Sequence, residues 1–471
     1  MSIQETIQEK ISRWVEQQRD NYLRDVSRLV AIRSVGGEGK EGMPFGEGPA
    51  AALAEALKIA REQGFLTKDY DGYVMTADLL EGERALDILA HLDVVGEGDG
   101  WETDPYTAVE KDGCLYGRGT DDDKGPAVAA MYAMSCVRSV AGSELKNNVR
   151  LILGTDEESG SRDIRYYYAR EKSAPYTFSP DANFPVINTE KGGFVGSFRR
   201  EWEACAALPR VSALDGGYRI NVLPADASAR VLGLTKAEIE GICAPMAAEM
   251  GVSLTVRKED DGVLLAVHGL AAHASTPEQG RNGITALIAM LHALPLAACS
   301  STEALAALAA LLPFGDGEGR ALGIAMADEI SGPLTLAFSL FKLTETGCEG
   351  SFDSRVPICA GEANCRAVAE KRFTDAGFAF HGGMRPPHHT PGDTPFVAAM
   401  LRSYETYSGR KGECLSMGGG TYVHDIPGGV AFGAAMPGFE SNLHSANERM
   451  NIGDMLTAIK IFAQVIYDLC T

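Results

Sequence analysis

The sequence has no CxxC pair, although its ten cysteines are scattered between Cys114 and Cys470. A chain of this size does not need disulfide bonds to stabilise its core, so the pattern predicts reduced thiols and a cytoplasmic location. Long hydrophobic runs are also missing: the most apolar stretch, "ALIAMLHALPLAAC", is too short to cross a membrane and contains Pro295. The chain starts with a polar, amphipathic stretch, which we expect to be neither a signal peptide nor a membrane span.

Basic residues are comparatively few. Lys and Arg number 43 against 64 Asp and Glu, and the net charge of -21 repels nucleic acid and anionic membranes. The sequence has no GxSxG elbow, no Walker A loop and no HExxH motif. "GEGKEG" at 37–42 matches GxGxxG, but no clear strand precedes it and no helix follows, so we do not expect dinucleotide binding. The partner expected from these absences is a small molecule, a peptide or a cation.

The length of 471 residues predicts two or three domains. Strand-like and helix-like runs alternate up to about residue 192, which indicates an α/β layer with a mainly parallel sheet flanked by helices. From residue 193 the pattern changes to that of an α+β module, and after the Pro-rich joint "PPHHTPGDTPF" helices and strands resume. We therefore predict a discontinuous α/β domain over 1–192 and 384–471, with an inserted α+β domain over 193–383.

Two strand ends carry residues suited to chemistry. In "LDILAHLDVV", His91 and Asp93 lie on one face near the C-terminal end of a buried strand, where parallel α/β sheets bind ligands. An isolated HxD is more often a hydrogen-bonded core histidine. In "LILGTDEESGS", Glu157 and Glu158 follow another buried run, where adjacent carboxylates need a cation or hydrogen-bond donors; a solvated acidic loop is the alternative. Asp181 is a further candidate, although alone it would be an ordinary turn residue.

The stretch "LYGRGTDDDKGPAV" has three consecutive aspartates, Asp121–Asp123, before a helix. The helix dipole favours one acidic residue at such a position, and three exceed that need. With His444 in "ESNLHSANERM", these segments offer histidine nitrogens together with several carboxylates. That mixture suits zinc, manganese or cobalt better than calcium or magnesium.

These segments resemble the M20 family of metallopeptidases, in particular its PepV-like and carnosinase-like dipeptidase branch. "AHLDVV", "GDGW", "YGRGTDDDKGP", "GTDEESG", "SPDANFPVINTEKG" and "GGGTY" occur in the order and approximate spacing of that family, from about residue 20 to 450. The resemblance implies a zinc-peptidase-like catalytic domain, a lid over 193–383, and two divalent metal ions per chain. The ligands that it implies are Asp122 as the bridge, His91 and Asp181 on one ion, and Glu158 and His444 on the other. It also implies a cis peptide after Asp122.

The resemblance assigns further roles near the metals and in the lid. Glu157 becomes the general base, and Asp93 orients His91. His273 in "LAAHASTPE" corresponds to the residue that stabilises the oxyanion, and Asn221 and Arg355 to those that hold the substrate's C-terminal carboxylate. Judged by residue chemistry alone, these three would more often be structural. The glycine-rich loop, with Gly419, Gly420 and Thr421, would approach the substrate, and a plain turn is the alternative.

The function that the sequence predicts is hydrolysis of short unblocked peptides, above all dipeptides, by a metal-bridging hydroxide with a glutamate base. The alternatives are an M20-type hydrolase of N-acyl amino acids or N-carbamoyl compounds, and a metal-binding relative without catalysis. Gly96 and "VHD" at 423–425 depart from the family pattern, which leaves the specificity for the substrate's amino end open. The size of the lid favours a monomer, with a homodimer as the alternative, and the expected partner is a small peptide.

Overall fold

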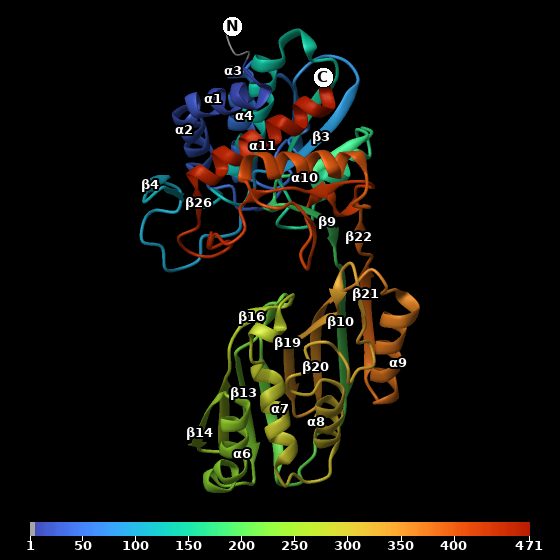
Figure 1. Ribbon diagram of the computed structural model, residues 1–471. Coiled ribbons are helices and arrows are strands. Elements are labelled where there is room, and N and C mark those ends of the chain that lie inside the picture. Colours follow the sequence, from blue (N-terminus) through green and yellow to red (C-terminus); the bar gives the residue numbers. More distant parts are fainter. Residues whose placement is uncertain (1–4) are drawn as a thin grey trace. The chain divides into compact units, whose positions relative to one another are not determined.

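The computed structural model describes residues 5–471, and the chain divides into two compact units (Figure 1). The first unit comprises the chain up to Thr189, His389–Leu415 and Gly420–Thr471, and the second comprises Glu190–His388 and Ser416–Gly419. The sequence predicted boundaries after residues 192 and 383. The segment Ser416–Gly419 groups with the second unit, where Lys191 N donates to Met417 O at 2.9 Å.

The first unit is built on a nine-stranded mixed sheet. Its centre is parallel, since β3 pairs in parallel with both β6 and β7, and β24 pairs in parallel with β7. The edge pairs β1–β2 and β2–β6 are antiparallel. In sheet order the strands are β1 (Leu66–Tyr70), β2 (Val74–Asp78), β6 (Asn148–Gly154), β3 (Arg84–His91), β7 (Tyr176–Ser179), β24 (Val430–Ala431), β9 (Val186–Glu190) and β22 (His388–His389), with β23 (Cys414–Met417) also paired to β9.

Seven helices accompany this sheet in the described part of the first unit: α1 (Ile7–Gln17), α2 (Arg19–Val30), α3 (Glu47–Glu62), α4 (Lys124–Ala141), α5 (Arg162–Tyr168), α10 (Pro395–Ser408) and α11 (Ile452–Cys470). A capping box formed by Thr6 and Glu9 begins α1, and Asn451 caps α11 by accepting a hydrogen bond from Asp454 N. The apolar helix α11 packs against α4, α10 and α1, so that it is buried on most sides (Figure 1). The predicted α/β layer is thus confirmed.

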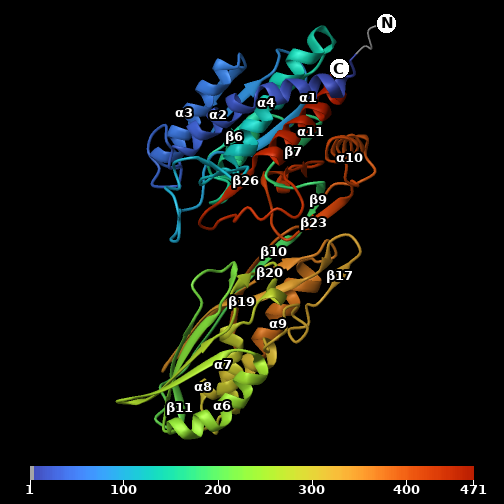
Figure 2. The same ribbon diagram turned by 60° about the vertical axis from the view of Figure 1, so that its left-hand side comes forward.

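The second unit is an eight-stranded sheet in which every neighbouring pair is antiparallel (Figure 2). Burial alternates along β13 and β15, as expected for a sheet with one face covered by helices. In sheet order the strands are β14 (Ser253–Glu259), β15 (Gly262–His268), β13 (Asp226–Leu232), β11 (Arg210–Gly216), β19 (Thr335–Thr344), β20 (Gly347–Val356), β10 (Gly192–Glu201) and β21 (Ala379–Arg385), and the helices are α6 (Lys236–Met250), α7 (Gly283–Ala293), α8 (Ser300–Leu311) and α9 (Ala367–Asp375). This confirms the α+β module.

Short elements complete both units. The small pairings are β4 (Val109–Lys111), β5 (Cys114–Tyr116) and β26 (Arg449–Asn451) in one sheet, then β8 (Ala182–Asn183) with β25 (Ala434–Ala435), β12 (Val222–Leu223) with β16 (Ala272–His273), and β17 (Ala327–Asp328) with β18 (Gly332–Pro333). The short helices are η1 (Gly142–Glu144), η2 (Pro277–Gln279), η3 (Glu362–Arg366) and η4 (Tyr422–Asp425). Within residues 5–471, no helix is both long and apolar enough to cross a membrane.

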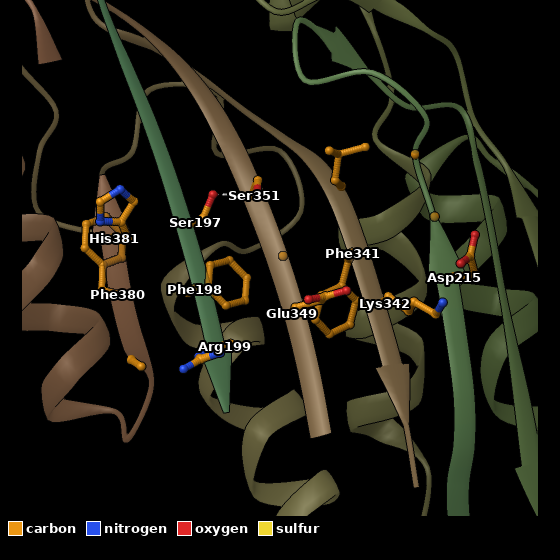
Figure 3. A pocket seen from close by; sticks show the side chains of 15 residues that line it. Ser197, Phe198, Arg199, Asp215, Phe341, Lys342, Glu349, Ser351, Phe380 and His381 are labelled. Carbon is orange, nitrogen blue, oxygen red and sulfur yellow. Dashed lines mark hydrogen bonds between the residues drawn. The ribbon is translucent and has the colours of Figure 1, made fainter. Parts of the chain in front are cut away.

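A hollow of about 600 Å³ lies on the sheet of the second unit, over the strands β10, β11, β19, β20 and β21 (Figure 3). Its lining mixes cationic and anionic side chains, among them Arg199, Lys342 and Glu349. The hydroxyls of Ser197 and Ser351, which also line it, lie 2.8 Å apart. The hollow contains no residue that the sequence singled out for chemistry.

Candidate metal centre

The C-terminal ends of three neighbouring parallel strands converge in the first unit. His91 is the last residue of β3, Glu157 and Glu158 follow β6, and Asp181 follows β7. Because β6, β3 and β7 are adjacent and parallel, the loops that follow them meet at one edge of the sheet. The topology therefore collects side chains that are far apart in the sequence.

Five predicted ligands form two groups that share one residue. His91, Asp122 and Asp181 present ligand atoms within 4.8 Å of one another, and so do Asp122, Glu158 and His444. The two oxygens of Asp122 are divided between the groups: Oδ1 lies 2.9 Å from His91 Nε2, and Oδ2 lies 2.8 Å from His444 Nε2. This arrangement suits a carboxylate that bridges two cations.

The hydrogen bonding of these atoms tests whether cations fit. Within residues 5–471, His91 Nε2 and Glu158 Oε1 are buried and have no hydrogen-bond partner, although Asp122 and His444 lie near them. Buried polar atoms without a partner are costly in an apolar environment. Nitrogen and carboxylate oxygen atoms that converge without hydrogen-bond geometry are what a zinc-type cation requires as ligands. The donor set therefore fits two divalent ions.

Electrostatics support the same interpretation. Contacts with Asp122 and Glu158 raise the pKa of His444 to about 10. Burial alone would raise the pKa of Asp122, but the two histidines outweigh it and lower that pKa. Burial and the neighbouring Asp122 raise the pKa of Asp181 well above its usual range. Positive charge, as protons or as metal ions, would stabilise this group of carboxylates, so we expect metal binding here to release protons.

Glu157 lies beside the ligands but belongs to neither group. Burial raises the pKa of the Glu157 carboxyl. The nearby carboxylates of Glu158 and Asp122 raise it further, whereas His91 lowers it. Its backbone is fixed by Asp93, whose two oxygens accept hydrogen bonds from Glu157 N at 3.2 Å and Glu158 N at 3.1 Å. His91 Nδ1 lies 2.9 Å from the backbone carbonyl of Asp93 and 3.5 Å from its carboxylate. Asp93 therefore contacts the histidine through its backbone oxygen and holds the two glutamates through its carboxylate.

The other two aspartates of the triplet have different surroundings from Asp122. Asp123 is fully buried, and its Oδ2 accepts a hydrogen bond from the backbone of His91 at 3.0 Å. It precedes α4 but makes no side-chain cap, so helix capping does not explain it. Burial raises the pKa of Asp121 to about 7, although a hydrogen bond from Ser441 acts to lower it. The peptide bond between Asp122 and Asp123 is cis, as the resemblance implied.

A buried ion pair that sequence reasoning missed links two of the ligand-bearing loops. Glu448, fully buried, contacts Arg118 at 2.7 Å, and its Oε1 accepts hydrogen bonds from the backbone of Gly119, Asp121 and Asp122 at 3.0 to 3.2 Å. Glu448 thereby holds the loop of the three aspartates to its own loop, four residues after His444. Its position close behind His444 in "HSANERM" was the available signal, but a surface charge is the usual interpretation of such a residue.

The predicted lid residues lie together within the second unit. Asn221 precedes β12 and His273 ends β16, and these two short strands pair. His273 Nδ1 lies 2.6 Å from the hydroxyl of Ser275. Arg355, on β20, donates to Gly418 O at 3.0 Å and to Asp353 Oδ2 at 2.8 Å.

The glycine-rich loop is divided between the two units. Gly419 belongs to the second unit, whereas Gly420 and Thr421 belong to the first. A Cβ placed on Gly418 would come within 2.8 Å of Ser275 Cβ, which brings the loop close to the segment of His273. Thr421 is buried and begins η4 by accepting a hydrogen bond from Val423 N.

Comparison with known proteins identifies the family. The model of peptidase family M20/M25/M40 matches residues 88–468. The chain belongs to this family of peptidases. Among M20 relatives, it is 34% identical to the putative dipeptidase YtjP of Bacillus subtilis, over 97% of this chain and 98% of the relative. It is 31% identical to the Beta-Ala-Xaa dipeptidase of Lactobacillus delbrueckii subsp. lactis, over 96% of this chain and 97% of the relative.

Solved structures agree on the M20 fold. Human carnosine dipeptidase 1 matches with a TM-score of 0.60 and 17% identity, over 99% of both chains. The aminoacylhistidine dipeptidase of Vibrio alginolyticus matches with a TM-score of 0.57 and 16% identity, over 95% of this chain and 96% of that one. The resemblance to M20 metallopeptidases and the expected fold class are therefore confirmed.

Proposed function

We propose that this M20 peptidase hydrolyses short unblocked peptides, above all dipeptides, at a site that holds two divalent metal ions. The observation that carries the proposal is Asp122, whose two oxygens each face a histidine and which belongs to both ligand groups. The relatives named as dipeptidases, which match nearly the whole chain, support the substrate class. Zinc is the ion that the donors favour, and manganese or cobalt would also suit them.

The ligands would be His91 and Asp181 for one ion, Glu158 and His444 for the other, and Asp122 for both. Bound divalent cations polarise a carbonyl group and lower the pKa of water to about 7. Glu157 would take the proton of the attacking water and deliver it to the leaving amine. Without metal ions, burial and the carboxylates of Glu158 and Asp122 raise the pKa of Glu157; ions bound to those two carboxylates would oppose that rise and keep Glu157 ionised as a base. Asp93 would keep Glu157 and His91 in position.

The second unit would supply substrate-binding groups. Arg355 would bind the C-terminal carboxylate of the peptide, since Asp353 and Gly418 already fix its guanidinium, and its planar fork can bind a carboxylate with two hydrogen bonds. Asn221 would assist it, and His273 would stabilise the oxyanion. Gly419, Gly420 and Thr421 would approach the peptide backbone. These roles rest on the resemblance to M20 dipeptidases.

The test measures hydrolysis by the purified protein, with and without a chelator. We expect cleavage of unblocked dipeptides, loss of activity in the chelator, and recovery on addition of zinc, manganese or cobalt. N-acetyl, N-succinyl and N-carbamoyl amino acids, assayed in parallel, should be poor substrates. Full activity in the chelator would contradict the metal requirement, and preference for the blocked amino acids would contradict the dipeptidase assignment.

Glu157→Gln is the matched variant for this test. It keeps the size of the side chain and all five proposed metal ligands, but removes the base. We expect its metal content to equal that of the wild-type protein while kcat falls by about 10²–10⁴-fold. A variant that lost both metal and activity would instead show that Glu157 is a ligand.

A further inference from the structure

The loop after β6, which carries Glu157 and Glu158, is held by two buried carboxylates rather than by one. Asp93 accepts from the amides of Glu157 and Glu158. Asp163 Oδ2 accepts from the two preceding amides, Thr155 N at 2.5 Å and Asp156 N at 2.9 Å. Four consecutive backbone N–H groups therefore point at two aspartates. Such a loop is fixed along its length, because each amide has a charged acceptor.

Asp163 is in turn held by a tyrosine that comes from a distant part of the chain. Tyr422, at the start of η4, donates its hydroxyl to Asp163 Oδ2 at 2.5 Å. Both side chains are buried: Asp163 is fully buried, and Tyr422 is 3% exposed. Burial raises the pKa of Asp163 to about 6, and the hydrogen bond from Tyr422 opposes that rise. The hydroxyl thus stabilises the charged acceptor on which the loop depends.

The ring of Tyr422 also contacts the proposed metal ligand His91. The two rings meet edge to face, with centroids 6.2 Å apart and planes at 86°. The side chain therefore lies against the histidine while its hydroxyl reaches the loop after β6. Tyr422 therefore connects the proposed metal ligand His91 with Asp163, which holds the loop of the proposed base Glu157.

A glycine makes room for this arrangement. Gly154, the last residue of β6, lies opposite His91 in the pairing of β3 with β6. A Cβ on Gly154 would overlap the Tyr422 hydroxyl and the Asp163 carboxylate. Only a glycine at the end of β6 leaves room for the hydrogen-bonded pair Asp163–Tyr422.

We propose that Asp163 and Tyr422 are positioning residues for Glu157 and Glu158: they fix the loop after β6, and thereby the base and one metal ligand, without contacting substrate or metal themselves. The inference rests on the proposed function. It extends that function to residues that the predicted site did not include. A general base must be held to within a fraction of an ångström, so loosening its loop should lower kcat rather than substrate affinity.

The experiment compares Tyr422→Phe with a matched control, Tyr132→Phe. Tyr132, on α4, is also buried and donates its hydroxyl to a buried aspartate, Asp25 on α2, at 2.7 Å. Each variant thus loses one buried tyrosine–aspartate hydrogen bond. Steady-state kinetics on a dipeptide, thermal unfolding, and hydrogen exchange of the backbone amides over residues 154–162 in the metal-free protein are measured for both.

We expect Tyr422→Phe to lower kcat about tenfold with KM nearly unchanged, and to speed amide exchange in this segment. Tyr132→Phe should lower the unfolding temperature by a similar amount while kcat and the exchange of this segment stay at the wild-type level. Asp163→Asn, which puts an amide in place of one acceptor oxygen, should act in the same direction as Tyr422→Phe.

Two results would overturn the inference: a kcat for Tyr422→Phe within twofold of wild type, or equal losses of kcat in both tyrosine variants. If the wild-type protein cleaves no dipeptide, the proposed function fails, and amide exchange alone decides the inference. Unchanged exchange in both Tyr422→Phe and Asp163→Asn would then refute it.

Discussion

Asp122 is the residue on which the proposed metal centre depends, because it faces a histidine with each of its oxygens. Asp121 makes contacts of another kind, with Ser441 and Glu448. We expect Asp122→Ala to bind neither ion tightly and to lose at least about 10³-fold in kcat/KM, and Asp121→Asn to lose only about tenfold. Metal analysis and kinetics on the two variants check this. Equal losses would mean that the bridging residue is misidentified.

The sequence allowed Asp122 to be chosen from three adjacent aspartates only through the family frame. Residue chemistry left the three equivalent, since each offers the same carboxylate. What distinguishes them is the direction of each side chain: Asp123 points to the backbone of His91, whereas Asp122 points between two histidines. Such directions depend on tertiary contacts, in particular on Glu448, which the sequence pattern could not reveal.

The ion pair of Glu448 with Arg118 gives a prediction about stability. Removing one partner of a buried pair leaves a charge without compensation, so Glu448→Ala should lower the free energy of unfolding by about 3–5 kcal/mol. Denaturant unfolding of the metal-free protein measures this. The matched control is Asp375→Ala, which removes an exposed pair with Lys371 and should cost less than about 1 kcal/mol. Similar values for both variants would contradict the structural importance of Glu448.

At the scale of elements, the strand ends that carry the site could be predicted from the sequence. Buried apolar runs before His91 and Glu157 identified β3 and β6, and the rule for parallel sheets placed their ends together. The strand pairing of the second unit could not be predicted in this way. There β10 pairs with β20, more than a hundred residues later, and alternation alone does not select the partner.

Two glycines should respond in opposite ways to the same substitution. At the end of β6, Gly154→Ala would force the new methyl group against Asp163 and Tyr422, so we expect a loss of about 1–3 kcal/mol in the free energy of unfolding. In the middle of α6, a Cβ on Gly241 meets nothing within 4 Å, so Gly241→Ala should gain about 0.5–1 kcal/mol. Unfolding curves of both variants provide the test. A neutral Gly154→Ala would show that the strand end can adjust.

At the scale of the whole molecule, the change in the strand and helix pattern and the Pro-rich joint predicted one discontinuous domain and one inserted domain. The sequence pattern gives no signal that Ser416–Gly419 groups with the second unit, because this grouping depends on contacts such as the hydrogen bond from the Arg355 guanidinium to Gly418 O. The first unit is discontinuous, and α11 from its last segment packs on α4 from its first.

This division predicts different behaviour for two fragments. Residues 190–388 contain the whole eight-stranded sheet, so we expect them to fold alone and to unfold cooperatively in urea. Residues 1–189 lack α10, α11 and β24, which cover the core of the first unit, so we expect no cooperative transition. Near-ultraviolet circular dichroism during urea titration measures both. Cooperative unfolding of the 1–189 fragment would contradict the shared core.

The discontinuity of the first unit has a consequence for synthesis on the ribosome. β3, α4 and β6 emerge from the ribosome early, but α10, β24 and α11, which complete their core, emerge only after Glu190–His388 of the second unit. His444 lies near the end of the chain, so a newly made molecule carries four of its five proposed ligands through most of translation without the last one. We therefore expect tight binding of the proposed metal ions only after His444 has been added, and until then the incomplete core of the first unit is exposed to aggregation.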